Sequence, residues 1–316
     1  MSGAPVAVGG GGPEGQTFAG LGAVSRWASF VKLPHTVFAL PFALVGVTLA
    51  SWTHAVTWTQ LGWAVLAFTS ARFAAMAFNR LVDRSFDALN PRTQQRELPR
   101  GVIGVGAARM SVVLAAALFV LSAWMLNPLC LLLSPVALGW VLGYSYAKRF
   151  TRYAHLWLGL GLSIAPAGGW LAVTGAWPAP WWLLPLLAIA VATWVAGFDV
   201  LYALPDAEFD RSQGLHSIPA AMGVSRAILV ARALHTVTLL MFVLVGVALP
   251  EAGAVAGVAW WVAVALAAGI LLYEHALVKA DDLSKLDAAF FTMNGVMSIG
   301  FFCCVLAGRL LAGARP

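Results

Sequence analysis

Long apolar stretches separated by short polar segments make up the chain from about residue 36 onward. A helix needs about 20 mainly apolar residues to cross the hydrocarbon core of a bilayer. The pattern contains nine such stretches, and Pro or Gly marks several of the connections between them. The stretches cover residues 36–53, 60–80, 107–126, 129–147, 153–174, 181–203, 227–249, 254–275 and 288–311. We therefore expect an all-α, polytopic membrane protein with nine transmembrane helices.

The N-terminal segment has a different character. Its first twenty residues are rich in Gly, Ala and Pro, and Glu14 is their one charged residue. They lack the basic start and the continuous apolar run of a signal peptide. We predict a disordered tail over residues 1–25 and a single transmembrane domain over residues 26–316.

Composition supports a bilayer as the solvent. Hydrophobic residues make up 61% of the chain and charged residues only 10%, whereas a soluble protein carries about 25% charged residues. The net charge of +6 is compatible with nucleic acid or with a membrane surface as the partner. Because the charges lie in short runs between apolar stretches, we interpret them as signals of topology and expect no nucleic-acid partner.

The basic residues are distributed asymmetrically across the predicted spans. If the N-terminus lies inside, the inner segments hold 15 of the 19 Lys and Arg residues, and the four outer connections hold none. Inner loops of membrane proteins carry an excess of Lys and Arg. The asymmetry predicts this orientation and an odd number of helices. In a bacterial-type inner membrane, the segments after the second and sixth spans would face the cytoplasm.

Acidic residues form two clusters on this inner side. The first follows the second span, with Asn79, Asp83 and Asp87 at positions i, i+4 and i+8. The second follows the sixth span and contains Asp199, Asp206 and Asp210 at positions i, i+7 and i+11. On a helix, each spacing places the side chains on one face. Pro205 would kink the second helix or cap its extension.

Paired acidic clusters at one membrane face favour a shared divalent cation. Like charges at i, i+4 repel each other, and carboxylates near a membrane are costly unless compensated. Oxygen ligands suit Mg²⁺, Mn²⁺ or Ca²⁺ better than zinc. The alternative is a solvated loop in which the acids balance nearby arginines. That alternative does not explain why the pattern occurs twice.

Basic residues beside the clusters suggest an anionic ligand. Arg92 and Arg96 follow the first cluster, and Lys148 follows the fourth span. Arginines in inner loops are commonly topology signals, but next to carboxylates and a metal they suit a diphosphate. Arg72 lies inside the second span, where a charged side chain usually faces the interior of a bundle. It would pair either with an anionic substrate group or with an acid on a neighbouring helix.

Two other polar residues are weaker candidates for the site. His155, like the other histidines, shows no metal-ligand spacing, and placement near the interface accounts for most of them. Asn294, early in the ninth span, is equally compatible with the site and with helix packing.

At these residues the sequence resembles the UbiA superfamily of intramembrane aromatic prenyltransferases. The pattern of that family is Asn-x-x-x-Asp-x-x-x-Asp in one segment and Asp-x-x-Tyr-x-x-x-Asp-x-x-x-Asp in another, and the likeness runs from about Lys32 to the end of the ninth span. The residues that match are Asn79, Asp83 and Asp87 in the first segment, Asp199, Tyr202, Asp206 and Asp210 in the second, and Arg92, Thr93, Arg96 and the run Tyr144-Ser-Tyr-Ala-Lys148-Arg149 beside them.

A narrower resemblance is to the 4-hydroxybenzoate polyprenyltransferase branch. It rests on the run His35-Thr-Val-Phe-Ala-Leu-Pro and on Ala77-Phe-Asn79-Arg. These runs are especially similar to relatives proposed for menaquinone synthesis by the futalosine route. The chain departs from many family members at Arg96-Glu97-Leu98-Pro99, where they have Arg-Pro-Leu-Pro. That departure bears on the aromatic acceptor more than on the chemistry.

The resemblance implies two four-helix halves around a central cavity, with a ninth helix added. It also implies Mg²⁺-dependent transfer of a polyprenyl group from polyprenyl diphosphate to a small aromatic acid of the 4-hydroxybenzoate type, in ubiquinone or menaquinone biosynthesis. The metal ligands would be Asp83, Asp87, Asp206 and Asp210, with Asn79 and Asp199 assisting. Arg92, Arg96, Lys148 and Tyr202 would bind the diphosphate or position the cation, and Arg72 would pair with the acceptor carboxylate.

Other functions stay open. Within the family, the acceptor could be a futalosine-pathway intermediate or one of the haem, chlorophyll or homogentisate type. Intramembrane acids also mark ion paths, so an ion-coupled transporter is a different class of candidate. The acids gather at one face and do not line a route across the membrane, which favours the enzyme.

Overall fold

The computed structural model describes residues 22–247, 249, 253–283, 286 and 292–313. Over these residues the protein is helical and has no β-strand, which confirms the all-α part of the prediction, while the arrangement in two four-helix halves stays a prediction. The predicted tail lies outside the described residues up to residue 21. The first helix, α1 (Ala23–Phe30), begins inside the range assigned to that tail.

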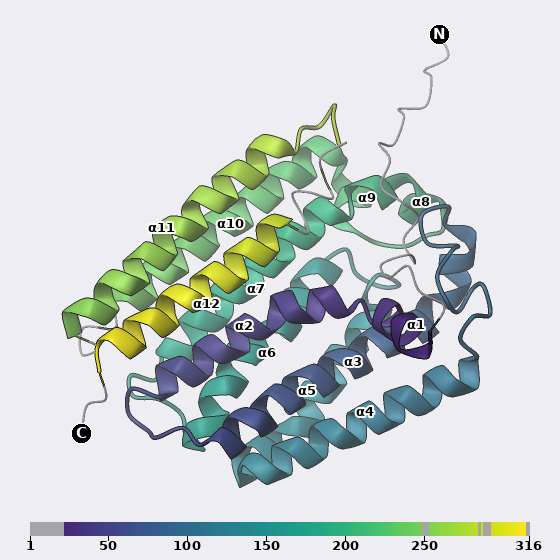
Figure 1. Cartoon of the computed structure of the whole chain (residues 1–316). Coiled ribbons are helices and arrows are strands. Elements are labelled where there is room, and N and C mark those ends of the chain that lie inside the picture. Colours follow the sequence, from purple (N-terminus) through teal and green to yellow (C-terminus); the bar gives the residue numbers. More distant parts are fainter. Residues whose placement is uncertain (1–21, 248, 250–252, 284–285, 287–291, 314–316) are drawn as a thin grey trace.

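The helices run side by side in a bundle (Figure 1). In chain order after α1, the elements are α2 (Leu33–Ala50), α3 (Trp58–Leu89), α4 (Val105–Leu126), α5 (Pro128–Ala147), α6 (Ala154–Thr174), α7 (Leu183–Tyr202), the 3₁₀ turn η1 (Leu204–Asp206), α8 (Ala207–Ser212), α9 (Ile218–Met222), α10 (Val224–Val247), α11 (Gly253–Leu277) and α12 (Asn294–Leu311).

Eight of the described helices are long and apolar enough to cross a membrane, namely α3 to α7 and α10 to α12. They coincide with eight of the nine predicted spans. Helix α2 coincides with the first predicted span, and the apolar part that is described covers Ala39–Ala50. The multi-pass architecture is therefore confirmed in its coarse form, and the count of nine stays a prediction.

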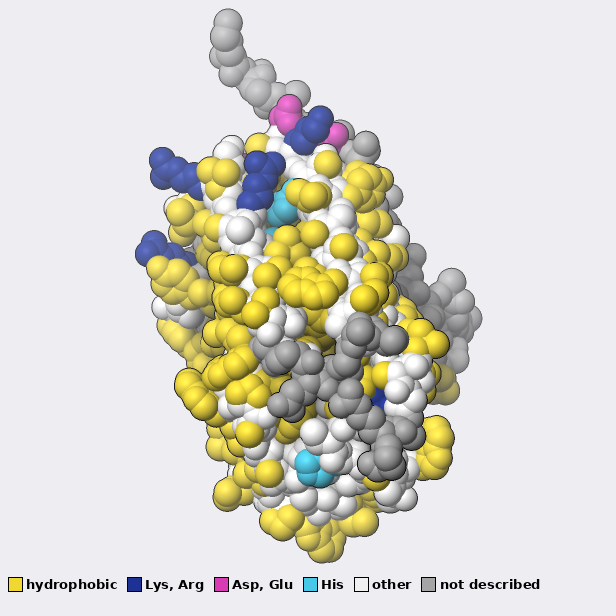
Figure 2. Space-filling model, turned by 90° about the vertical axis from the view of Figure 1, so that its left-hand side faces the viewer, with side chains coloured by type: hydrophobic (Ala, Val, Ile, Leu, Met, Phe, Trp, Pro, Cys, Tyr) yellow, Lys and Arg dark blue, Asp and Glu magenta, His cyan; other side chains and the backbone are white. Residues whose placement is uncertain are grey.

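The outer surface fits a lipid environment. Figure 2 shows hydrophobic side chains over the middle of one face, with Lys and Arg mostly toward one end. Large apolar side chains such as Trp124, Leu132 and Leu272 are exposed. An exposed apolar band with charged residues at its end is typical of membrane proteins, because lipid replaces water around the band.

Helix α3 is longer than the predicted span. It starts in a capping box, in which Thr57 accepts from the backbone N–H of Gln60 and the Gln60 side chain accepts from the backbone N–H of Thr57. This exchange satisfies amide groups that have no partner within the helix. At the other end, α3 continues to Leu89, nine residues beyond the predicted limit at residue 80. The first acidic cluster therefore lies on a continuous helix.

Close helix packing fixes the centre of the bundle. A side chain at Gly46 of α2 would meet the carbonyl oxygen of Pro166 on α6 at 2.0 Å, and one at Gly169 of α6 would meet that of Ala43 on α2 at 2.1 Å. Only glycine permits backbones to approach this closely. Helix α6 also packs against α3 and α7, the helices that carry the first acidic cluster and Asp199.

The second acidic cluster does not lie on one helix. Helix α7 ends at Tyr202, Pro205 lies in the first turn of η1, and α8 starts a new helix at Ala207. The expectation that Asp199, Asp206 and Asp210 share a helical face is therefore wrong. The physical reason is Pro205, which has no N–H to continue the hydrogen bonding of α7.

Candidate active site

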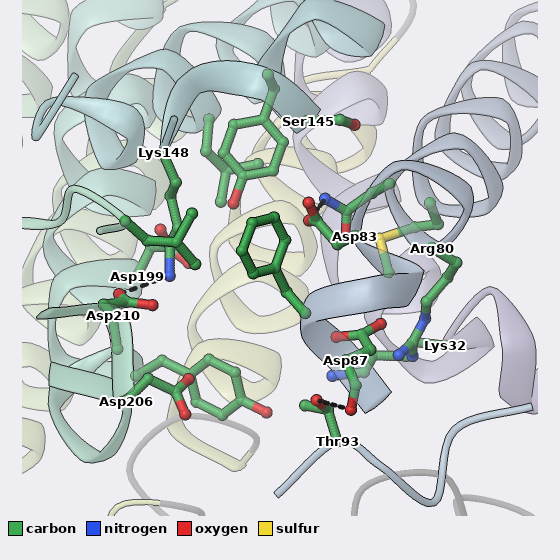
Figure 3. A pocket seen from close by; sticks show the side chains of 18 of the residues that line it. Lys32, Arg80, Asp83, Asp87, Thr93, Ser145, Lys148, Asp199, Asp206 and Asp210 are labelled. Atoms are coloured by element: carbon green, nitrogen blue, oxygen red, sulfur yellow. Dashed lines mark hydrogen bonds and ion pairs between the residues drawn. The ribbon is translucent and has the colours of Figure 1, made fainter. Parts of the chain in front are cut away.

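Both clusters open into one cavity of about 250 Å³. Figure 3 shows Asp83 and Asp87 on one side of it and Asp199, Asp206 and Asp210 on the other. The residues predicted for the site all line this cavity, namely Arg72, Asn79, Asp83, Asp87, Arg92, Arg96, Lys148, Asp199, Tyr202, Asp206 and Asp210. Segments more than a hundred residues apart in the chain therefore form a single site.

The first cluster is ordered largely within α3 and the turn after it. The side-chain amide of Asn79 donates to Oδ2 of Asp83 at 2.8 Å. Asp87 is buried, and its Oδ1 accepts from Nη1 of Arg96 at 2.6 Å. The hydroxyl of Thr93 donates to the backbone carbonyl of Asp87 at 3.1 Å. Helix and turn therefore present these side chains in a register that the i, i+4, i+8 spacing predicts.

The second cluster is held by distant segments. Oδ1 of Asp206 accepts from the Asn90 side chain at 3.2 Å, and Oδ2 accepts from Nη2 of Arg92 at 2.5 Å. Nζ of Lys148 donates to Oδ2 of Asp210 at 3.0 Å. The loop after α3 and the end of α5 therefore supply the contacts that replace a continuous helix.

Four of the five site carboxylates pair with a basic side chain. Asp83 lies 3.4 Å from Nη2 of Arg149, in addition to the Asp87–Arg96, Asp206–Arg92 and Asp210–Lys148 pairs. The fifth, Asp199, lies 2.7 Å from Nδ1 of His155. The site is thus nearly balanced in charge, and its basic groups lie where an anionic ligand would meet them.

Lys148 is held in its charged form. Burial lowers the pKa of the Lys148 ammonium, but the carboxylates of Asp210, Asp206 and Asp199 raise it, and the net pKa lies above its ordinary value. An ammonium that stays protonated is suited to neutralising a phosphate group.

Tyr202 lies under two cations. The Arg92 guanidinium is 4.7 Å from the centroid of the Tyr202 ring, and Nζ of Lys32 is 5.6 Å from it. The ring face carries partial negative charge and attracts both groups. Lys32 adopts a left-handed backbone conformation (φ 48°) between α1 and α2, and it lines the cavity.

An apolar cavity of about 550 Å³ adjoins the polar one. Arg72, Met76, Asn79 and Tyr144 line both. Nε of Arg72 is buried and has no hydrogen-bond partner in the described part of the chain. Arg72 therefore lies at the junction of the two cavities with unused hydrogen-bonding capacity.

The carboxylates share a cavity without converging on a point. Within the described ranges, no three His, Cys, Asp or Glu side chains stand close enough together to hold a metal ion. Each carboxylate is instead directed to its own partner. Oδ2 of Asp87 is buried without a hydrogen-bond partner among the described residues.

Comparison with known proteins decides the family. Residues 39–296 match the UbiA prenyltransferase family. The chain belongs to this family. The resemblance noted in the sequence is thereby confirmed, and the protein is a prenyltransferase.

Relatives of this prenyltransferase agree with that assignment. The 4-hydroxybenzoate octaprenyltransferase of Vibrio campbellii is 30% identical over 85% of this chain and 88% of its own length. The enzyme of that name from Burkholderia ambifaria is 31% identical, over 81% of this chain and 85% of its own length.

Solved structures agree as well. The apo structure of a UbiA homologue from Aeropyrum pernix K1 superposes with a TM-score of 0.76 at 34% identity, and the match covers 88% of this chain and 97% of that one. A UbiA homologue from Archaeoglobus fulgidus bound to DMAPP and Mg²⁺ shares the fold, with a TM-score of 0.73 at 20% identity and coverage of 91% and 100%.

Sequence reasoning missed several residues of this prenyltransferase. Lys32, Asn90, Arg149 and His155 all contact or line the site. Lys32 and Asn90 lie beside a predicted span and a motif residue, and their predicted inner-side position was the only available signal. Arg149 ends the run that matches the family, so the resemblance offered a signal for it. His155 was assigned to the interface, yet its side chain is fully buried against Asp199. The resemblance to the family gave no reason to single it out.

Proposed function

We propose that this prenyltransferase transfers a polyprenyl group from polyprenyl diphosphate to an aromatic acid of the 4-hydroxybenzoate type, in ubiquinone or menaquinone biosynthesis. We place the reaction at the cytoplasmic face of a bacterial-type inner membrane. The observation that carries the proposal is the junction at Arg72 between a carboxylate-lined polar cavity and a larger apolar one. The first suits a metal-bound diphosphate, and the second suits an isoprenoid chain.

The donor set fits Mg²⁺. Site oxygens come from carboxylates and an amide, which hard cations prefer. The buried Oδ2 of Asp87 has no hydrogen-bond partner among the described residues, which leaves this oxygen available to coordinate a cation. Asp83, Asp87, Asp206 and Asp210 would hold the ions, with Asn79 assisting. Mg²⁺ bound there supplies positive charge that stabilises the departing diphosphate.

The basic residues have two uses in this scheme. In the structure Arg92, Arg96 and Lys148 neutralise three of the carboxylates. When those carboxylates hold metal, the same cations become available to the diphosphate oxygens close by. Charge-assisted hydrogen bonds from Arg and Lys stabilise the leaving group as its charge develops.

Transfer requires one bond to break and another to form. The C–O bond of the allylic diphosphate breaks with its electron pair leaving on diphosphate, and the cation-like carbon is attacked by the electron-rich ring ortho to its hydroxyl. The ring carbon then gives up its proton to the released diphosphate, which restores the aromatic ring. Asp199 lines the cavity, and in the described part of the chain its ion-pair partner is His155 and not a Lys or Arg. We propose that its carboxylate faces the developing positive charge. The apolar cavity excludes water, which would otherwise capture the cation.

Arg72 would bind the acceptor carboxylate. Arg72 lines both cavities, and its Nε is buried without a hydrogen-bond partner in the described part of the chain. A bidentate bond to a carboxylate would satisfy it. The names of the Vibrio and Burkholderia relatives favour 4-hydroxybenzoate. A futalosine-pathway, haem, chlorophyll or homogentisate type of acceptor is the second candidate, because Glu97 departs from the common family pattern nearby.

The decisive experiment is a transfer assay on purified protein in detergent. Geranyl diphosphate and 4-hydroxybenzoate are supplied with and without Mg²⁺, and prenylated product and diphosphate are both measured. We expect product only with the metal. Diphosphate release without prenylated 4-hydroxybenzoate would reject this acceptor, and no release with any acceptor would revive a transporter.

Arg72 variants test the acceptor assignment. We expect Arg72→Ala to raise KM for 4-hydroxybenzoate roughly 100-fold while KM for geranyl diphosphate changes little, because one buried charge-assisted pair is lost. Arg232→Ala is the matched control, since Arg232 lies within α10 and lines neither cavity. Equal effects on both substrates would argue against a role in acceptor recognition.

A further inference from the structure

Asp199 differs from the other site carboxylates in its partner. Asp83, Asp87, Asp206 and Asp210 face Arg or Lys side chains, whereas Oδ2 of Asp199 lies 2.7 Å from the imidazole of His155. His155 is the second residue of α6 and is fully buried. Asp199 lines the polar cavity and His155 does not. The imidazole therefore stands behind the carboxylate, away from where substrate binds.

The second ring nitrogen defines the role of the imidazole. The backbone N–H of Ile218, at the start of α9, donates to Nε2 of His155 at 3.4 Å. Because Nε2 accepts, the proton of a neutral ring resides on Nδ1 and is donated to Asp199. His155 is thus held at both ring nitrogens, with Nδ1 directed at one carboxylate oxygen of Asp199.

This arrangement connects Asp199 to the rest of the second cluster. The segment between α8 and α9 is pinned by His216 N–H to the Lys148 carbonyl at 2.6 Å and by Leu215 N–H to the Asp210 carbonyl at 2.8 Å. Ile218 follows two residues later and bonds His155. A single imidazole therefore ties α6, Asp199 on α7 and the backbone beside Asp210 and Lys148 into one unit.

We propose that His155 is a positioning residue that holds the Asp199 carboxylate at the reacting end of the prenyl diphosphate. The basic partners of the other carboxylates can turn to the diphosphate when substrate and metal bind. His155 is buried and bonded on both sides, so Asp199 keeps its orientation through that exchange. The inference rests on the prenyl transfer proposed above, but not on which aromatic acid is the acceptor.

Two substitutions, one close to His in volume and one smaller, separate positioning from packing. His155→Leu fills the space without a donor, and His155→Asn keeps an N–H near the position of Nδ1. We expect kcat to fall about 10- to 100-fold in His155→Leu, as is typical when the hydrogen-bond partner that orients a site residue is lost. KM for both substrates should change little, and His155→Asn should recover most of the rate. A thermal unfolding midpoint in detergent reports whether each variant is folded.

A double-mutant cycle tests whether the effect passes through Asp199. In an Asp199→Ala background, His155→Leu should cost about twofold or less, because the group it positions is absent. His235→Leu is the matched control. His235 is also buried and bonds α7, through the Trp194 carbonyl at 3.2 Å. Its effect should be the same with and without Asp199.

The outcomes are distinguishable. If wild type prenylates no 4-hydroxybenzoate but releases diphosphate with Mg²⁺, the acceptor is wrong, and the same cycle is run on the release rate. A folded His155→Leu with the rate of wild type overturns the proposal, as does an undiminished loss in the Asp199→Ala background. Absence of any release by wild type contradicts prenyl transfer and this inference together.

Discussion

The two acidic clusters reach one cavity by different means. The first lies on the uninterrupted helix α3, where the Asn79–Asp83 hydrogen bond is internal. The second crosses a break between α7 and α8, and its carboxylates are fixed by Asn90, Arg92, Lys148 and His155 from other segments. Local backbone geometry therefore positions the first cluster, and tertiary contacts position the second. The five predictions below test this difference, starting with the largest expected effect.

The clusters should be equivalent in chemistry despite their different scaffolds. We expect Asp87→Asn and Asp210→Asn each to lower kcat roughly 1000-fold, because each removes a carboxylate proposed to hold the charge-stabilising metal. Turnover of geranyl diphosphate at saturating Mg²⁺ measures both. If one variant keeps a rate near wild type, the two clusters do not share a metal site.

A proline introduced into the continuous helix α3 should lower the rate more than removal of the proline between α7 and α8. Ser85→Pro places a proline between Asp83 and Asp87, at a cost of about 3 kcal/mol in a helix interior. If the same free energy is lost from transition-state stabilisation, because Asp83 and Asp87 no longer hold their relative positions, the rate falls roughly 100-fold. Ser85 is exposed, so Ser85→Ala serves as the control and should behave like wild type.

Pro205→Ala is the counterpart in the second cluster. We expect a loss of roughly tenfold or less, because the bonds of Asp206 to Asn90 and Arg92 persist when the backbone regains an N–H. Product formation is compared at saturating substrate. A loss as large as that of Ser85→Pro would mean that local geometry, not tertiary contact, sets the second cluster as well.

The two loop arginines should differ in importance. Arg92 binds Asp206, whose position depends on contacts from other segments of the chain. Arg96 binds Asp87, which helix α3 already positions. We expect Arg92→Ala to raise KM for geranyl diphosphate roughly 100-fold and Arg96→Ala roughly 10-fold, since truncating a buried charge pair costs several kcal/mol at most. Initial rates over a range of diphosphate concentrations decide between them. The reverse order would contradict the comparison.

The smallest effect is expected at Arg149. Its pair with Asp83 is long, at 3.4 Å, and both side chains are about a third exposed. Such pairs contribute little, so Arg149→Ala should change KM for diphosphate by about threefold or less. A change comparable to that of Arg92→Ala would show that Arg149 contacts the substrate.

The sequence by itself determined the membrane architecture and most of the site residues. Apolar length predicts spans because a bilayer admits only backbone that satisfies its own hydrogen bonds. The spacing of Asn79, Asp83 and Asp87 predicts a shared face because the helix period is local. The predicted site residues line one cavity, and the two motifs lie at or just beyond the C-terminal ends of α3 and α7, two helices long enough to span a membrane.

Tertiary structure alone decided which partners the carboxylates of the second cluster have. Pro205 ended α7, so the periodicity of the second cluster no longer held, and contacts across more than a hundred residues replaced it. Glu97, unusual for the family, accepts from Ser29 on α1 at 2.5 Å. His155 carried no sequence signal and yet binds Asp199. Spacing along a chain encodes neighbours within a helix, but contacts between helices depend on packing, which only the folded bundle fixes.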